Sequence, residues 1–256
     1  MMKRTTLLLI ILALSHLPIR SQHYITPGIG FSGAFYQSEG LDRFKTSYNS
    51  VYNPYLAKYM QGLGQVVGLR GEIGYRRIER FGIAVLVGMQ NYVSNDLAQF
   101  QNGETRKFEL KTKSLFLEGE IGYTHNNLFI NGVCTFFFNR KLSLKSTYSN
   151  PITNEDITNK ALNGTYKGDT SISVDLGIAA GIYRDPVILI AKATYPIFTA
   201  GGSSVLEDNK LEKIENHTNV FPDDYRAYLL SEPYSGIASN IDGLKISLTV
   251  AFAIPL

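Results

Sequence analysis

The segment Ile246–Ile254, with the sequence ISLTVAFAI, carries the clearest structural signal in the chain. Large apolar side chains stand at every second position, and small or polar side chains stand between them. A repeat of two over this length predicts a β-strand with one face in an apolar medium and the other facing a small, polar space. The apolar positions are Ile246, Leu248, Val250, Phe252 and Ile254, and the others are Ser247, Thr249, Ala251 and Ala253.

Other segments show or approach the same alternation, so we expect eight strands in all. Two of them, at the start of the chain and before the last long connection, are weaker matches. A third is apolar on both faces near Phe136–Phe138, so its phase stays open. The seven further segments are Pro27–Gln37, Leu69–Arg76, Phe81–Gln90, Leu115–Thr124, Leu128–Leu142, Ile172–Ile182 and Val187–Thr199.

The connections between these segments alternate between long and short. An up-and-down barrel in a membrane has tight turns on one side and extended loops on the other, whereas a soluble barrel has no reason to sort its loops in this way. We therefore predict an all-β fold: an eight-stranded antiparallel up-and-down transmembrane β-barrel with short periplasmic turns and long extracellular loops. The short connections fall near Arg76–Arg80, His125–Asn127 and Arg184–Pro186, and the long ones at Ser38–Gln61, Ser94–Thr105, Ser146–Gly164 and Ala200–Asp242.

The start of the chain has the three parts of a secretory signal peptide. Met1–Arg4 is basic, and the apolar run Leu7–Leu14 is too short to span a bilayer as a helix. We expect cleavage after Ser21. The domain prediction is thus a signal peptide over residues 1–21 and a barrel over residues 22–256, exported to the outer membrane of a Gram-negative bacterium.

Charge and cysteine content narrow the function classes. Removal of Lys3, Arg4 and Arg20 with the signal leaves 22 basic residues against the 22 acidic residues of the chain. A nucleic-acid surface needs a basic surplus, and a neutral chain does not provide one. Cys134 is the single cysteine, so it forms no disulfide within the chain.

A repeated sequence motif indicates where the barrel wall meets the membrane–water interface. The pentapeptide GEIGY occurs at Gly71–Tyr75 and again at Gly119–Tyr123, each time just before a short connection. Tyr75 and Tyr123 would then stand at the same membrane–water interface as part of an aromatic girdle. Ordinary cross-strand aromatic packing is the alternative.

The same alternation turns several charged side chains toward the inside of the barrel. The interior of an eight-stranded barrel is just wide enough for side chains to fill it. We therefore expect a structural ion-pair network that closes the lumen, and a narrow ion or proton path is the alternative. The residues are Arg70, Glu72, Glu118, Glu120, Asp175, Lys192 and Lys245, with Arg76 expected near the rim.

The long connections are the candidate contact surfaces. Tyr48, Tyr52, Tyr55 and Tyr59 crowd the first of them, and aromatic-rich loops of this size commonly make contacts. The alternative is that these loops fold down and cap the barrel.

An enzyme site on the loop side is a weaker alternative. His217 has Ser203, Asp208, Asp223 and Asp224 near it in sequence, but no nucleophile motif or metal-ligand spacing connects them. We predict no catalytic residues, no metal and no cofactor.

As a whole, the chain resembles the small eight-stranded outer-membrane barrels of the OmpA/OmpX type, and more narrowly the barrel proteins of Bacteroidota, among them PorT-like proteins. The resemblance rests on the signal end Ser21–Gln22, the eight strands and the C-terminal FAIPL. Leu256 stands where such barrels commonly end in Phe, and Phe252 is the substitute we expect for it. A PorT-like identity would imply a role in type IX protein secretion.

The sequence thus predicts a non-enzymatic outer-membrane barrel that acts through its extracellular loops, as an envelope structural protein or as a component of a membrane assembly. The expected partners are outer-membrane lipids, the barrel-insertion machinery and an envelope or secretion-complex protein. The competing functions are a loop-side lipid-modifying enzyme, a narrow small-solute channel and a soluble lipocalin-like carrier. The carrier would place its apolar residues inside and its charges outside.

Overall fold

A computed structural model describes residues 22–150, 163–202, 207–208 and 241–256. The predicted signal peptide over residues 1–21 lies outside these ranges, as does most of the last long connection.

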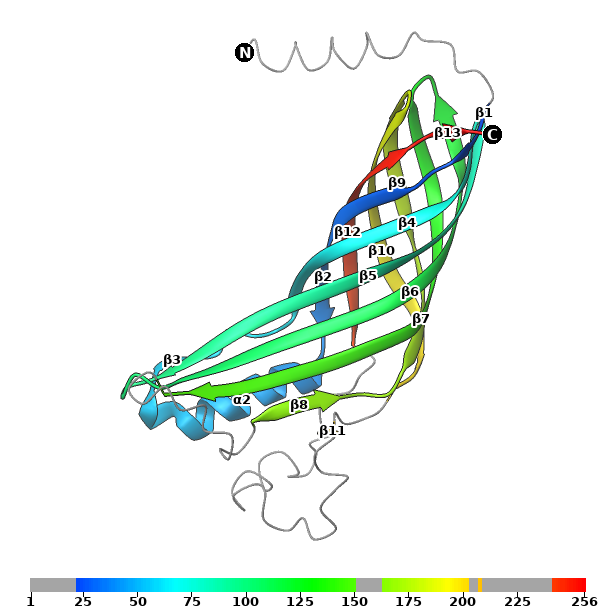
Figure 1. Ribbon diagram of the computed structural model, residues 1–256. Helices are drawn as coiled ribbons and strands as arrows, with labels where there is room; N and C mark the ends of the chain where they lie inside the picture. The colour runs from blue at the N-terminus through cyan, green and yellow to red at the C-terminus, as the bar shows by residue number, and fades with distance from the viewer. Residues whose placement is uncertain (1–21, 151–162, 203–206, 209–240) are drawn as a thin grey trace, which may run out of the picture.

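Eight strands form one closed antiparallel ring (Figure 1). Neighbours in sequence pair with one another, and the last strand pairs with the first from Asp242 opposite Gln37 to Ala251 opposite Gly28. The predicted eight-stranded antiparallel up-and-down barrel is confirmed. Its strands are β2 (Gly28–Gln37), β4 (Gln65–Ile78), β5 (Phe81–Phe100), β6 (Thr105–His125), β7 (Leu128–Ser149), β9 (Ser171–Arg184), β10 (Val187–Gly201) and β12 (Asp242–Phe252).

Side chains alternate across the barrel wall as the sequence pattern predicts. Phe31 is 74% exposed and Phe252 is 52% exposed, whereas Glu120 is 2% exposed. Apolar side chains therefore cover the outside and polar ones fill the inside. This arrangement is the reverse of the one that a soluble lipocalin-like carrier requires.

Short elements complete the two ends of the barrel. At the short-turn end, β1 (Gln22–Ile25) pairs with both β4 and β13 (Ile254–Pro255), so the first and last parts of the barrel also meet there. At the other end lie α2 (Glu39–Tyr52), the 3-10 helix η2 (Asn53–Tyr55), β3 (Leu56–Lys58), β8 (Gly164–Lys167) and β11 (Glu207–Asp208).

The loop prediction was right for the short connections and wrong in part for the long ones. Strands β4 and β5, β6 and β7, and β9 and β10 are each joined by two residues. Ser94–Thr105 is not a long loop, because β5 continues to Phe100 and β6 starts at Thr105. The predicted loop Ser146–Gly164 likewise begins too early, because β7 continues to Ser149. The far ends of β5, β6 and β7 carry many polar residues on their outer face. The sequence pattern does not distinguish such strand ends from a polar loop.

A β-bulge resolves the open phase of β7. Up to Phe137 the odd-numbered residues face inward, and from Arg140 the even-numbered residues do. The pairing with β9 shifts between these two residues, and Asn139 between them has a positive φ of 51°. The bulge therefore explains why Phe136–Phe138 reads as apolar on both faces.

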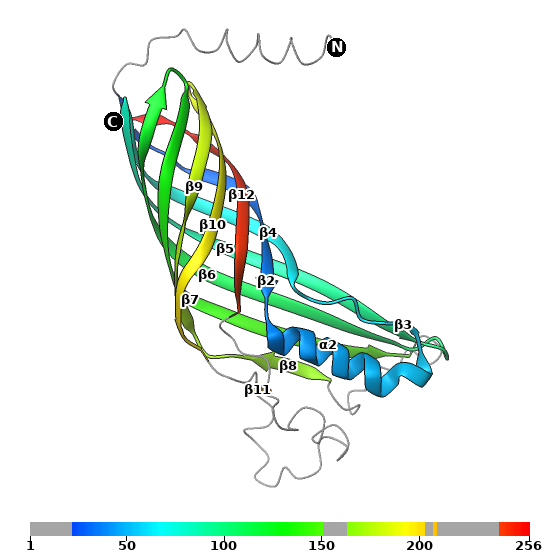
Figure 2. The same cartoon turned by 180° about the vertical axis from the view of Figure 1, so that it is seen from behind.

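The long strands β5, β6 and β7 project beyond the rest of the ring, and α2 lies against their inner side (Figures 1 and 2). Ser38 caps the helix, since its Oγ accepts a hydrogen bond of 3.2 Å from the backbone N–H of Leu41. Phe44 then stands edge-on to Phe108, with ring centroids 5.3 Å apart. We call this packing the loop-side core; its buried members include Tyr36, Leu41, Phe44, Tyr48, Leu56, Met60, Leu63, Tyr92, Phe108, Leu110, Leu142 and Leu144.

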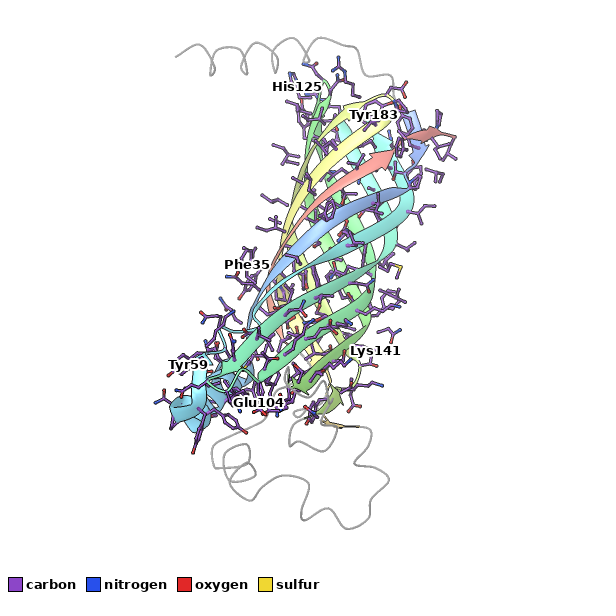
Figure 3. All side chains as sticks on the ribbon, turned by 60° about the vertical axis from the view of Figure 1, so that its left-hand side comes forward. Phe35, Tyr59, Glu104, His125, Lys141 and Tyr183 are labelled. Atoms are coloured by element: carbon purple, nitrogen blue, oxygen red, sulfur yellow. The ribbon has the colours of Figure 1, made fainter. Side chains whose placement is uncertain are left out.

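A second apolar cluster, the turn-side core, fills the opposite end of the lumen. Tyr24 is buried there, and its hydroxyl lies 2.6 Å from that of Tyr183. Figure 3 shows Tyr183 and His125 at this end, and Tyr59 and Glu104 at the other. The remaining members are Ile78, Phe129, Val133, Ala179, Ile188, Ile190, Ala251 and Ala253.

The loop-side core predicts the effect of removing its central ring. Phe44→Ala should lower the free energy of unfolding of this end by about 3–5 kcal/mol, because a buried phenyl group leaves a cavity. Trypsin should then cleave α2 at Arg43 or Lys45 while the barrel strands stay protected. Phe31→Ala, on the outer face, is the control and should leave α2 protected. Equal cleavage rates for Phe44→Ala and the wild type would contradict this packing.

Candidate functional site

The charged side chains predicted for the lumen come together in the middle of the barrel. All of them are at most 6% exposed, and five strands supply them. They lie between the turn-side core and the loop-side core. Strand β4 carries Arg70, Glu72 and Arg76, β6 carries Glu118 and Glu120, β9 carries Asp175, β10 carries Lys192 and β12 carries Lys245.

Glu118 is the central acceptor of this charged cluster, and its side chain is inaccessible to solvent. One carboxylate oxygen accepts from Arg70 at 2.8 Å and from the Thr135 hydroxyl at 2.7 Å. The other oxygen accepts from Lys192 Nζ at 2.5 Å. Strands β4, β6, β7 and β10 are thus joined across the lumen through one carboxylate.

Glu120 forms the second part of the cluster with Arg76. The two Arg76 nitrogens donate to its two oxygens at 2.7 and 3.1 Å, and Asn131 donates at 2.9 Å. Arg76 was expected near the rim, but its side chain is only 3% exposed and belongs to the cluster. A bidentate arginine–carboxylate pair is among the stronger polar contacts in proteins, because both donors are aligned at once.

Lys192 connects the two parts. Its Nζ lies 3.0 Å from Glu120 and 3.3 Å from Glu72, in addition to its contact with Glu118. Glu72 also accepts from Arg70 Nε at 2.7 Å. One ammonium group therefore faces three carboxylates, and two guanidinium groups supply the remaining positive charge.

A separate pair stands beside this network. Lys245 Nζ donates to Asp175 at 2.5 Å, and Ser173 donates to the same carboxylate at 3.2 Å. The ammonium also lies 4.7 Å from the centre of the Phe137 ring. With this pair included, the four cations of the charged cluster match its four anions, so the cluster has no net charge.

Aromatic rings hold the guanidinium groups in place. The Arg70 guanidinium carbon lies 3.9 Å from the centre of the Phe116 ring, and that of Arg76 lies 5.4 Å from the Phe129 ring. A desolvated cation over a ring face is stabilised by about 2 kcal/mol. Phe116 and Phe129 thus contribute to the charged cluster as well as to packing.

Sequence reasoning missed one inward ion pair. Arg140 donates to Asp242 at 2.5 Å, and its side chain is 3% exposed. The bulge before Arg140 obscures its direction in the sequence, and the sequence pattern places Asp242 at the end of a long connection. The sequence offers one signal for this pair: a basic residue near the end of one predicted strand and an acidic residue just before another.

Little open space remains between these groups. A cavity of about 10 Å³, roughly the room of a single water molecule, lies between the cluster and the loop-side core. Its polar walls include Arg70, Gln90, Lys192, Lys245 and Ser247.

The two girdle candidates lie on the outer face near the short turns. Tyr75 is half-buried and its hydroxyl hydrogen bonds with His23. Tyr123 is 45% exposed and stands opposite Phe81, with ring centroids 6.2 Å apart. Both tyrosines therefore pack against a neighbouring ring, and both still reach the surface.

The four loop tyrosines divide into two groups. Tyr48 is 2% exposed and Tyr52 packs on Phe100, so these two belong to the loop-side core or its edge. Burial also raises the pKa of Tyr48. As a surface contact candidate Tyr48 is corrected, because α2 turns its side chain inward, whereas Tyr52 is half-buried and keeps part of its surface exposed. Tyr55 and Tyr59 are 63% and 41% exposed.

The enzyme alternative cannot be assembled from the described residues. His217, Ser203, Asp223 and Asp224 lie outside them, and Asp208 belongs to β11. In the part of the chain that the structure describes, no group of three His, Cys, Asp or Glu side chains is placed to hold a metal ion. Within the same residues, no helix has the length and apolar character needed to cross a membrane.

Comparisons with known proteins give fold likeness only. No family model matches the chain, and no curated protein sequence matches it. Among solved structures, Ail, the attachment invasion locus protein of Yersinia pestis, is similar with a TM-score of 0.40 and 8% identity, over 92% of this chain and all of that one. The outer membrane protease OmpT from Escherichia coli is similar with a TM-score of 0.41 and 8% identity, over 92% of this chain and 96% of that one.

The cluster predicts a strong dependence on its central carboxylate. Glu118→Gln should lower the free energy of unfolding by about 3–5 kcal/mol, because Arg70 and Lys192 then remain buried without their shared counter-charge. Urea titration of the detergent-folded protein, followed by circular dichroism, measures the change. The control is Glu109→Gln on the outer face, whose exposed ion pair should matter by less than about 1 kcal/mol. Equal stability of both variants would show that Glu118 does not organise the lumen.

Proposed function

We propose that this protein is a non-enzymatic barrel of the outer membrane of a Gram-negative bacterium, exported with the help of its N-terminal signal. The supporting observation is the apolar outer face of a closed ring that surrounds a charge-balanced cluster of buried ion pairs. Exposing that apolar outer face to water would be unfavourable, whereas contact with lipid chains would be favourable. Closure also leaves no unpaired strand edge within the ring, as a bilayer requires.

A second part of the proposal is that the barrel does not conduct solutes. Three layers fill the lumen: the turn-side core, the charged cluster and the loop-side core with α2. The contacts of Lys192 and Glu118 cross the middle of the lumen, where a solute would have to pass. Opening a path there would require separating buried ion pairs at a cost of several kcal/mol each.

Function would then reside on the loop side, as an envelope structural protein or a component of a membrane assembly. Tyr55 and Tyr59 are exposed there, beside α2 and β3. Exposed tyrosines offer apolar contact area together with a hydroxyl group, a combination typical of protein interfaces. The resemblance to PorT-like barrels makes a type IX secretion complex the candidate assembly.

Membrane placement and closure can be tested together. The protein should require detergent for extraction from the cell envelope, and in planar bilayers it should give no stepwise conductance. The apolar exterior predicts the first result and the filled lumen predicts the second. Recovery in the soluble fraction would contradict the membrane proposal. Regular conductance steps would show a solute path through the charged cluster.

The loop-side contact can be tested with a photo-reactive phenylalanine analogue at Tyr55 or at Tyr59. Both positions should cross-link to one and the same envelope protein in living cells, since both side chains reach the surface. The same analogue at buried Tyr48 is the control and should cross-link only within the chain. Absence of an intermolecular product at both exposed positions would rule out a protein contact through this surface.

A further inference from the structure

Five lysines gather on the outer face of β6 and β7, just where these strands leave the apolar part of the barrel wall. Every one of them is exposed, and one acidic residue, Glu109, lies among them. Figure 3 shows Lys141 on the outside of the barrel. We call this surface the lysine patch: Lys107, Lys111 and Lys113 on β6, and Lys141 and Lys145 on β7.

The lysine patch begins directly after the last apolar pair on these two strands. Leu115 stands opposite Phe138 on the outer face, and the next outward pair is Lys113 opposite Lys141. Two residues along a strand cover about 7 Å, which a lysine side chain can span. The ammonium groups thus lie at the height where an apolar bilayer core would give way to headgroups, with their stems along the wall.

The β-bulge of β7 creates the second half of the lysine patch. If the strand alternated regularly through Asn139 without a bulge, Arg140 would face outward and Lys141 inward. With it, Arg140 pairs with Asp242 inside, and Lys141 and Lys145 face outward. Both halves of the patch therefore lie on the same outer surface.

The charges of the lysine patch are unbalanced. Lys113 lies directly opposite Lys141, a like-charge arrangement that destabilises a sheet. Among the described residues, the one ion pair of the patch joins Lys111 to Glu109 at 2.7 Å. A hydrogen bond from Lys111 and the charges of Lys107 and Lys145 lower the pKa of Glu109, which shows how densely the cations surround it.

The surplus of positive charge ends at β5. On the adjacent strand β5, the outward residues opposite Lys113 and Glu109 are the neutral Asn91 and Asn95. On the other side, β8 places the exposed Lys167 opposite Ser143, between Lys141 and Lys145, so the positive surface continues there. The chemistry of the site is that of clustered ammonium groups beside an apolar wall.

From this geometry we propose that the lysine patch binds the phosphate groups of lipid headgroups in the leaflet on the loop side. Ammonium groups bind phosphates as point charges, and two or more of them close together suit a headgroup with more than one phosphate. A lipid fits better than a free anion, because its chains can lie on Leu115 and Phe138 below the lysines. The inference rests on the proposed membrane placement.

Binding of diphosphoryl lipid A to the detergent-folded protein, measured by native mass spectrometry, tests the proposal. The wild type should bind this lipid more tightly than the same lipid without phosphates. Lys113→Gln/Lys141→Gln should weaken binding by about 30-fold, because each lysine near a lipid surface contributes about a factor of five. The matched control Lys45→Gln/Lys58→Gln removes two charges on α2 and β3 and should leave binding unchanged.

Three results would overturn the proposal: equal binding by Lys113→Gln/Lys141→Gln and the wild type, equal binding of the lipid without phosphates, or displacement of the lipid by millimolar inorganic phosphate. Insertion into vesicles of pure phosphatidylcholine separates this inference from the membrane placement. Insertion without phosphate-dependent lipid binding would reject the lysine patch alone, whereas failure to insert would reject the membrane placement.

Discussion

The interior of this barrel depends on the sharing of the Glu118 carboxylate between Arg70 and Lys192. Taking an ion out of water costs several kcal/mol, so each buried charge requires a nearby partner. An eight-stranded ring is just wide enough for side chains from opposite walls to meet. The width of the ring thus makes the network possible, and the network in turn cross-links strands that are far apart in sequence. Around this cluster the outer face of the ring is apolar, since the charges at that level point inward.

Layering follows from that central constraint. Charged groups occupy the middle of the lumen, and each end is filled by an apolar cluster built from different elements. At the turn end, Tyr24 of β1 and Tyr183 of β9 contribute rings. At the loop end, α2 supplies Phe44 and Tyr48 against the projecting strands. The connection after β2 thus serves mainly as a plug, and it leaves only a few of its aromatic side chains at the surface.

The sequence allowed prediction of the strands and of their outer faces, because a period of two is set by backbone geometry alone. Residues such as Glu120 and Val250 could be assigned to a face without any tertiary information. Three features could not be predicted. The bulge at Asn139 changes the phase within a run that is apolar on both faces. Beyond the apolar wall, polar residues of a strand and of a loop have the same composition, so Ser94–Thr105 was misread. The burial of Tyr48 depends on a helix docking against strands that had not been expected to reach it.

Unequal strand lengths make the barrel asymmetric about its axis. Strand β7 has 22 residues and β2 has 10, and the longest strands β5, β6 and β7 are neighbours. A difference of twelve residues corresponds to roughly 40 Å along the strand. One side of the barrel therefore rises as a wall while the other ends low. A neighbouring molecule would meet a tall polar wall on the side of β5, β6 and β7 and a low rim on the opposite side. The contacts available to it would therefore depend on the side from which it approaches.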